Sequence, residues 1–382
     1  MATKQEREKV KAMKNILYGT TALVAVSLLA GTAGAAEKIK LGLGGYWRGA
    51  IHIGDNDSDA NPQTTDFRSH GLGQESEIYF SGKTTLDNGI KFGVMVQLEG
   101  ETSGDQIDNT YIWTDGSFGR VEFGETWGVS LLMSSGSVGE MLNGHGDFGS
   151  QAAIGMLNGL GVNSYGGDAG ILQTPDQKIQ YFTPRMSGFQ LGVSYMPENN
   201  TGNNSTGGGI NSTLNGNVGN ELLDVGANYV GKMGGTDIRV SGSRFVSDTE
   251  ATAVGAAAGP DADGYSVSGQ VGMSGFRIGG RYTKIDDRAG VANTDRVQWR
   301  AGVDYASGPY KVGIVYHLAN DDVAAVNRDD ETRYISVGAQ YTMGPGIMLF
   351  GGLEFWDFED SSNTAATQGN NTVGVIGTLF SF

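Results

Sequence analysis

Apolar and polar residues alternate one by one along most of this chain, and this rhythm constrains its fold more than any other feature. In residues 295–305, for example, Val297 and Trp299 alternate with Arg296 and Gln298. Successive side chains of a β-strand point to opposite faces of a sheet, so each such run has one apolar and one polar face. The alternation predicts sixteen strands, over residues 37–51, 73–87, 89–101, 107–116, 118–126, 177–186, 188–197, 221–232, 236–246, 263–274, 276–286, 294–306, 309–319, 332–343, 346–357 and 371–382.

The composition suits strands that face water on one side. Only 38% of the 382 residues are hydrophobic, and the mean hydropathy is −0.24. A soluble core of this size needs more apolar residues, so either much of the chain is disordered or its apolar side chains face something other than a core. A barrel with lipid outside and water inside fits the second alternative.

The connections between the expected strands alternate between short and long. Tight turns are expected at residues 87–89, 115–117, 187–188, 274–275, 307–308 and 344–345. Long polar loops are expected at residues 52–71, 128–175, 198–219, 247–262, 287–293, 320–330 and 358–370. Short turns at one end and long loops at the other are typical of outer-membrane barrels. The sequence therefore predicts an all-β fold: a closed antiparallel transmembrane barrel of about 16 strands.

Residues 1–35 are predicted to be a secretory signal peptide. A basic start is followed by apolar residues 16–30 and by a small-residue cleavage site at residues 33–35. A membrane-spanning helix is the alternative, but the apolar stretch is short and no charged stop-transfer sequence follows it. The mature barrel would then occupy residues 36–382. Met13 is a second candidate for the start, because the sequence from there is the better signal.

The chain is acidic, with a formal net charge of −16. Its first 35 residues carry +3, so their removal would leave −16 − 3, or about −19. Nucleic acid is not expected as a partner, since phosphate binding needs a basic face. Two interpretations of the acidity stay open: a solvated acidic surface, or an acidic lumen that enriches cations.

No residue pattern points to catalysis, a cofactor or a metal, and we expect none of these. Cys is absent, which excludes disulfides and thiolate zinc sites, and the four His residues are not in H-E-x-x-H spacing. The cluster Asp55, Asp57 and Asp59 offers oxygen ligands but lacks the Gly and the distant Glu of an EF-hand. We interpret it as a solvated loop, with weak ion binding as the alternative.

Two stretches resemble the Gram-negative general diffusion porin family. Tyr111–Gly124, YIWTDGSFGRVEFG, resembles the strand–turn–strand before that family's constriction loop, and Lys178–Tyr195, KIQYFTPRMSGFQLGVSY, resembles the hairpin after it. The terminal Phe382 is similar to the family's terminal assembly signal. The resemblance implies a homotrimer of 16-stranded barrels in the outer-membrane lipid of a Gram-negative bacterium, with residues 128–175 as a constriction loop folded into the lumen.

Charged residues on the polar strand faces are expected to line the lumen, because a charge facing lipid near mid-bilayer costs about 2–4 kcal/mol. By the resemblance, acidic residues of the loop face basic residues of the wall at the narrowest point. The loop-side candidates are Glu140, Asp147 and Asp168. The wall-side candidates are Arg48, Lys83, Lys91, Arg120 and Lys178, and the other lumen-facing cations are Arg239, Arg277, Arg281, Arg296, Arg300 and Lys311.

Each of these cations has a simpler alternative role, which is to solvate the lumen or to pair with Asp or Glu. One departure from the family pattern matters for selectivity. Glu125 stands where the family commonly has Arg, which weakens any expectation of anion preference.

Large aromatic residues near strand ends are candidates for girdles at the two water–lipid interfaces. The Trp candidates are Trp47, Trp113, Trp127, Trp299 and Trp356. The facing of residues 107–114 and 346–357 stays ambiguous, because both faces there carry large apolar side chains.

These patterns predict a water-filled channel for passive diffusion of ions and small hydrophilic solutes, with a mild preference for cations. A substrate-selective channel on the same barrel is the main alternative, and it would show saturable flux and an aromatic track. A barrel enzyme would need a Ser/His/acid set at one rim, which is not apparent. A soluble adhesin or solenoid would need a short fixed repeat, and none is apparent.

Overall fold

Sixteen antiparallel strands close into one barrel in the part of the chain that the computed structural model describes, residues 38–57, 68–100, 107–136, 138–142, 175–199, 218–251, 253–288, 290–323, 328–359 and 369–382. The predicted fold class is confirmed. The predicted signal peptide lies outside the described residues. The strands are β1 (Lys40–Asp57), β2 (His70–Thr85), β3 (Lys91–Glu99), β4 (Ile107–Gly116), β5 (Gly119–Glu125), β6 (Gln177–Phe182), β7 (Phe189–Met196), β8 (Val218–Met233), β9 (Thr236–Thr249), β10 (Asp263–Met273), β11 (Phe276–Asp286), β12 (Arg296–Ser307), β13 (Tyr310–Val323), β14 (Arg328–Gly344), β15 (Ile347–Glu359) and β16 (Gly369–Ser381).

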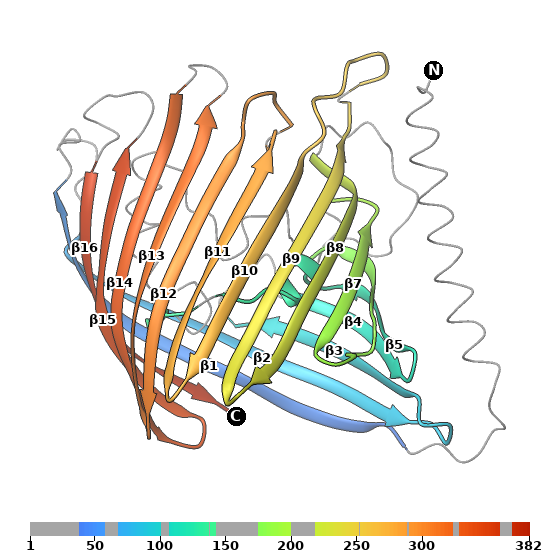
Figure 1. Ribbon diagram of the computed structural model, residues 1–382, viewed down its shortest axis with the longest axis horizontal. Helices are drawn as coiled ribbons and strands as arrows, with labels where there is room; N and C mark the ends of the chain where they lie inside the picture. Colours follow the sequence, from blue (N-terminus) through green and yellow to red (C-terminus); the bar gives the residue numbers. More distant parts are fainter. Residues whose placement is uncertain are drawn as a thin grey trace.

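The barrel closes between its first and last strands. The β1–β16 ladder runs from the pair Tyr46–Ser381 to the pair Asp57–Asn370. Just beyond it, the backbones of Gly45 and Phe382 exchange two hydrogen bonds of 3.0 and 3.1 Å. Figure 1 shows the inclined strands, with the C-terminus at the same end as the tight turns. Closure removes every sheet edge, so the strand backbone can lie in lipid with its polar groups paired.

Apolar side chains point away from the barrel axis. Ile278, Val303 and Ile314 are cross-strand partners on β11, β12 and β13, and they are 63%, 36% and 42% exposed. Within the described residues, no helix layer and no second sheet covers this row. Such exposure would be costly in water, and it is what a lipid-facing surface requires.

No helix among the described residues is long and apolar enough to cross a membrane. The one helical element there, α2 (Val129–Leu132), follows β5.

Two belts of outward-facing aromatic side chains border the apolar rows. Toward the long-loop end, Tyr282 packs against both Tyr265 and Trp299, with ring centroids 5.8 and 4.4 Å apart. At the short-turn end, aromatic pairs join neighbouring strands with centroids 4.5 to 5.0 Å apart. These pairs are Phe189–Tyr229, Phe276–Tyr305 and Tyr310–Tyr341. Belts of this kind are typical of the two water–lipid interfaces of an outer-membrane barrel.

The girdle hypothesis is wrong for Trp113 and Trp356. Trp47 and Trp299 are 38% and 53% exposed on the outward face, but Trp356 is 2% exposed and Trp113 lies against the inward-facing Gly93. Both of the inward Trp residues occupy the polar positions of their strands. Periodicity did not reveal this because both faces of these strands carry large side chains.

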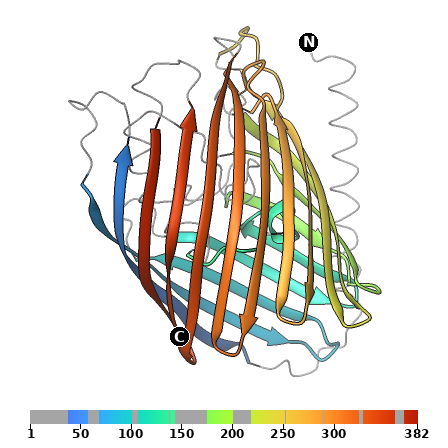
Figure 2. The ribbon, with the colours of Figure 1, turned by 60° about the vertical axis from the view of Figure 1, so that its left-hand side comes forward.

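Some strands continue past the limits that the alternation predicted. Residues 52–57 and 320–323 were expected in loops, but they belong to β1 and β13. The ladder between β13 and β14 continues to the pair Val323–Arg328. Strand pairing needs only backbone groups, so a hairpin can extend beyond its apolar segment, as the tall hairpins of Figure 2 show. The alternation did not predict these extensions because their residues are mostly polar.

Substitution of Val303 by Arg should destabilise the folded barrel by about 2–4 kcal/mol, because the new charge would face lipid midway between the two aromatic belts. Gln270→Arg is the matched control, since Gln270 lies on the inward face of β10 and is only half-buried. Urea titration in lipid vesicles, followed by the heat-modifiable gel shift, measures both variants. Equal destabilisation would contradict the assigned facing.

Candidate functional site

The chain turns into the barrel directly after β5. We call the described residues 126–136 and 138–142 the inward segment. Its helical turn α2 is held by β8: the Ser130 N–H donates to Asp224 Oδ2 at 2.8 Å, and the Ser130 hydroxyl bonds the same carboxylate. Asn228, also on β8, donates its side-chain amide to the carbonyl of Met133 at 3.0 Å. Figure 2 shows this helical turn within the ring of strands.

From α2 the inward segment passes over the next two strands, β9 and β10. The backbone N–H of Ser135 faces the hydroxyls of Ser241 and Ser268 at 3.0 and 3.2 Å. Arg281 on β11 donates to the hydroxyl of Ser134 at 2.8 Å. Small hydroxyl side chains therefore replace bulky ones where the segment and the wall are close.

Beyond β10, the segment lies on inward-facing glycines that are cross-strand neighbours. Gly279 pairs with Gly302, and Gly313 pairs with Gly338, which pairs with Gly352. A Cβ atom on Gly302 would overlap the carbonyl oxygen of Val138, and one on Gly313 would lie 2.7 Å from that of Gly139. We call these five residues the glycine track. They allow backbone-to-backbone contact that any side chain would prevent.

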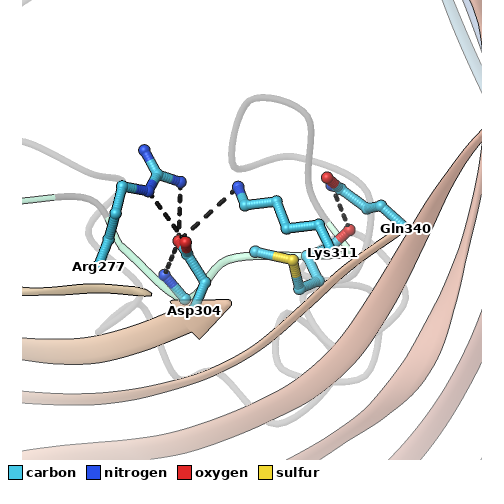
Figure 3. Close-up of polar contacts among 6 residues, drawn as sticks. Arg277, Asp304, Lys311 and Gln340 are labelled. Atoms are coloured by element: carbon cyan, nitrogen blue, oxygen red, sulfur yellow. Dashed lines mark hydrogen bonds and ion pairs between the residues drawn. The ribbon is translucent and has the colours of Figure 1, made fainter. Parts of the chain in front are cut away.

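Asp304 on β12 ties the segment to three strands (Figure 3). Its carboxylate accepts the Gly139 N–H at 3.2 Å and two bonds from Arg277 on β11, at 2.9 and 2.7 Å. Lys311 on β13 lies 3.7 Å away. The Asp304 side chain is 1% exposed. Charge-assisted bonds of this kind are the strong ones, and one buried carboxylate here satisfies two cations and an amide.

The sequence-predicted loop acid Glu140 faces the wall next to this tie. Its carboxylate bonds Arg300 on β12 and accepts the Tyr334 hydroxyl of β14 at 2.7 Å. The following carbonyl, of Met141, accepts the side-chain amide of Gln340 at 2.8 Å (Figure 3). Arg300 was expected to face the lumen without a stated partner, and the structure brings it to Glu140. The other two loop-side candidates, Asp147 and Asp168, lie outside the described residues.

The wall-side candidates occupy β1, β2, β3, β5 and β6, and β3 to β6 are opposite β11 to β14 of the glycine track in the strand order. Arg48 is 1% exposed and forms an ion pair with Glu75. Lys91 is 3.9 Å from Asp115 and its side chain is 57% exposed. Lys83 lies on the inward face of β2, two residues before the strand ends at Thr85 next to a tight turn.

Two further wall-side candidates differ in their surroundings. The Arg120 guanidinium lies over the ring of Trp113, 4.6 Å from its centroid, and 2.5 Å from Glu122. Lys178 is buried and donates to the carbonyls of Thr126 and Asp176, the second at 2.8 Å. Lys178 therefore secures the base of the inward segment instead of presenting its charge to open water.

The remaining lumen-facing candidates all lie on the inward sides of their strands. Arg296 is buried and holds Asp321 on β13, with its second guanidinium bond at 2.6 Å. Arg239 is exposed near the short-turn end of β9. The terminal Phe382 is 68% exposed and takes part in barrel closure through its backbone. In the described part of the chain, no group of three or more His, Cys, Asp or Glu residues is arranged to hold a metal ion.

Comparison with known proteins identifies the family. A family model described as Gram-negative porin matches residues 19–374. The chain belongs to the Gram-negative porin family. It is an outer-membrane β-barrel of the porin type, as the sequence resemblance implied. No curated protein sequence matches it.

Solved porin structures share the fold at low identity. The anion-selective porin from Comamonas acidovorans has a TM-score of 0.60 at 17% identity, over 90% of this chain and 100% of that one. OmpT, an outer membrane protein of Vibrio cholerae, has a TM-score of 0.60 at 14% identity, over 91% of this chain and 99% of that one. A porin refined at 1.8 Å resolution scores 0.55 at 15% identity, over 90% and 100%.

Sequence reasoning did not find the glycine track or the Asp304 tie. The only available signal was the frequency of Gly at polar-face positions. Asp304 sits at a polar position of its strand, but nothing in the sequence distinguishes it from other lumen carboxylates.

Gly302→Ala should displace the inward segment from the wall, at a cost of about 1–3 kcal/mol for overpacking. Gly242→Ala is the matched control, because a Cβ atom there has its closest neighbour at 3.9 Å. Limited chymotrypsin digestion of the folded protein, read by mass spectrometry, reports cleavage after Leu131, Leu132 or Met133. Faster cleavage is expected for Gly302→Ala only. Unchanged protection would contradict the close approach.

Asp304→Asn should make the lumen more attractive to anions, because Arg277 and Lys311 lose their shared negative partner while an oxygen stays available for the Gly139 N–H. In a planar bilayer with a KCl gradient, the zero-current potential should shift toward the anion side. Asp286→Asn, at the long-loop end of β11, is the control for a general loss of charge. An equal shift in both variants would count against a specific role for Asp304.

Proposed function

We propose that this protein is a general diffusion porin, which lets ions and small hydrophilic solutes cross the outer membrane passively. The observation that supports this most strongly is the division of the two barrel faces. Apolar rows point outward, while Arg, Lys, Asp, Glu, Ser and Gly line the inward face. Barrels of sixteen or more strands are wide enough to leave an aqueous channel after their inward side chains are placed.

The inward segment supports a constricted channel. It is bonded to strands from β8 to β14, so it takes up lumen on that side of the barrel. In this proposal residues 128–175 form the constriction loop, with Glu140, Asp147 and Asp168 on the loop side. Arg48, Lys83, Lys91, Arg120 and Lys178 form the wall side.

We further propose a mild cation preference. Several lumen cations are neutralised by neighbouring carboxylates, as in the pairs Arg296–Asp321 and Arg300–Glu140. Local compensation leaves the net charge of the chain, −16 in the full sequence, to set the sign of the overall potential. A strong preference is not expected from a lumen in which opposite charges alternate.

The proposal includes export and assembly. Residues 1–35 would be removed as a signal peptide, the mature barrel would assemble as a homotrimer, and Phe382 would act in outer-membrane assembly. The long loops would then face the outside of the cell.

The alternatives keep the same barrel. A substrate-selective channel would need aromatic rings that solutes can reach. The inward Tyr334 and Trp356 are 3% and 2% exposed, whereas Tyr46, Tyr79, Tyr111 and Trp113 on the opposite wall are half-buried. Saturation of flux in the recordings below would favour this alternative. The diffusion proposal requires no enzymatic step, and a hydrolase assay on the purified protein would reveal one.

Single-channel recording in a planar bilayer tests the proposal. We expect stepwise conductance that rises in proportion to salt concentration, and a zero-current potential of the cation-selective sign in a KCl gradient. Vesicle swelling with neutral sugars should show rates that depend on solute size and do not saturate. Absence of conductance would contradict the porin proposal, whereas an anion-selective potential would contradict only the proposed sign of selectivity.

A further inference from the structure

Charge is segregated along the barrel axis. The odd-numbered strands run from the short-turn end to the long-loop end, and several carry an inward-facing cation near their start. Arg239 on β9, Arg277 on β11 and Lys311 on β13 are of this kind. β3 runs from Lys91 to Glu99, both on the inward face. The short-turn mouth is therefore relatively basic, although the whole chain is acidic.

The cations at the short-turn mouth are more exposed to water than the carboxylates that they contact. Lys83 and Arg239 form no ion pair with any carboxylate of the described residues. Arg277 and Lys311 share the single carboxylate of Asp304, and their side chains are 39% and 28% exposed while that of Asp304 is 1% exposed. Two carboxylates at this mouth are exposed: Asp237, 58% exposed and 3.2 Å from Lys232, and Asp115, 40% exposed and 3.9 Å from Lys91. Even with these, the inward-facing cations described at this mouth outnumber the carboxylates.

The inward face at the long-loop ends of the same strands lacks such an excess of cations. Asp321 on β13 and Asp330 on β14 are cross-strand partners on that face. Asp321 binds Arg296 and lies 3.8 Å from Arg288, so both cations there have a carboxylate partner. The short-turn mouth is therefore the more basic end of the lumen, and walls of low dielectric focus its field into the channel.

We propose that the short-turn mouth is an anion-binding vestibule, formed by Lys83 and Lys91 on one side and by Arg239, Arg277 and Lys311 on the other, and that it takes small polyvalent anions from that side. This inference rests on the proposed channel function. β3 and β11 are eight strands apart in a closed order of sixteen, so the two groups face each other across the mouth. A polyvalent anion gains from several cations together, whereas one charge pair in water contributes little.

Sided block by inorganic tripolyphosphate tests the vestibule. We expect the anion to reduce conductance at a concentration about tenfold lower when added on the short-turn side than on the long-loop side, in 0.1 M KCl. In 1 M KCl the sidedness should shrink toward unity, since the Debye length falls from about 10 Å to about 3 Å. The chain contains no Cys. Ser117→Cys in the β4–β5 turn, labelled with a membrane-impermeant maleimide, therefore reports which side the short turns face.

Charge variants then locate the site. Lys83→Gln combined with Arg239→Gln should weaken block from the short-turn side by at least about threefold. Lys284→Gln combined with Arg244→Gln removes the same charge at the long-loop end, on the outward face, and should leave the block unchanged. If the first double variant does not fold, Lys91→Gln replaces it, because the Lys91 side chain is 57% exposed. It should also weaken block from the short-turn side.

Three results would overturn the vestibule: equal block from both sides, unchanged block in the short-turn variants, or equal weakening in the control pair. Each of them is measured on a conducting channel. A protein that does not conduct in KCl would instead contradict the proposed porin function, so the two failures are distinguishable.

Discussion

Backbone hydrogen bonding without water is the constraint on which this structure depends. Lipid offers no partner to an exposed N–H or C=O group, so strands can cross it only in a closed ring. The pairing of β1 with β16 completes that ring, and the backbone bonds between Gly45 and Phe382 extend it to the last residue. Once the ring is closed, side chains can only alternate between lipid and lumen. That alternation explains both the low hydrophobic content of the chain and its lack of a central apolar core.

The inward segment is held by contacts that a closed ring makes available on its inner wall. It needs wall positions without side chains, and the glycine track supplies them on five neighbouring strands. It also needs its own amides satisfied away from bulk water, which Asp224 and Asp304 do with carboxylates and Ser241 does with a hydroxyl. The glycines set the distance between the inward segment and the wall, and the polar side chains set where along the wall the segment lies. The width of the channel therefore depends on both.

The charges inside the barrel act at two ranges. At short range they pair across strands, and pairs such as Arg296–Asp321 stabilise the wall more than they affect passing ions. At long range the excess that pairing leaves is distributed along the axis, and inward-facing cations without a carboxylate partner of their own lie near the short turns. A net charge summed over the whole chain hides this distribution, which affects multivalent solutes most.

The sequence by itself determined the strands, their number, their apolar faces and the alternation of short and long connections, because a period of two residues is a local property of an extended backbone. It also placed Glu140 and the basic wall residues on the lumen side. Only the tertiary structure decided that Glu140 contacts Arg300, that Trp356 faces inward, and that one aspartate, Asp304, binds the inward segment. Those contacts join residues more than a hundred positions apart, and they depend on register and closure, which no local pattern encodes.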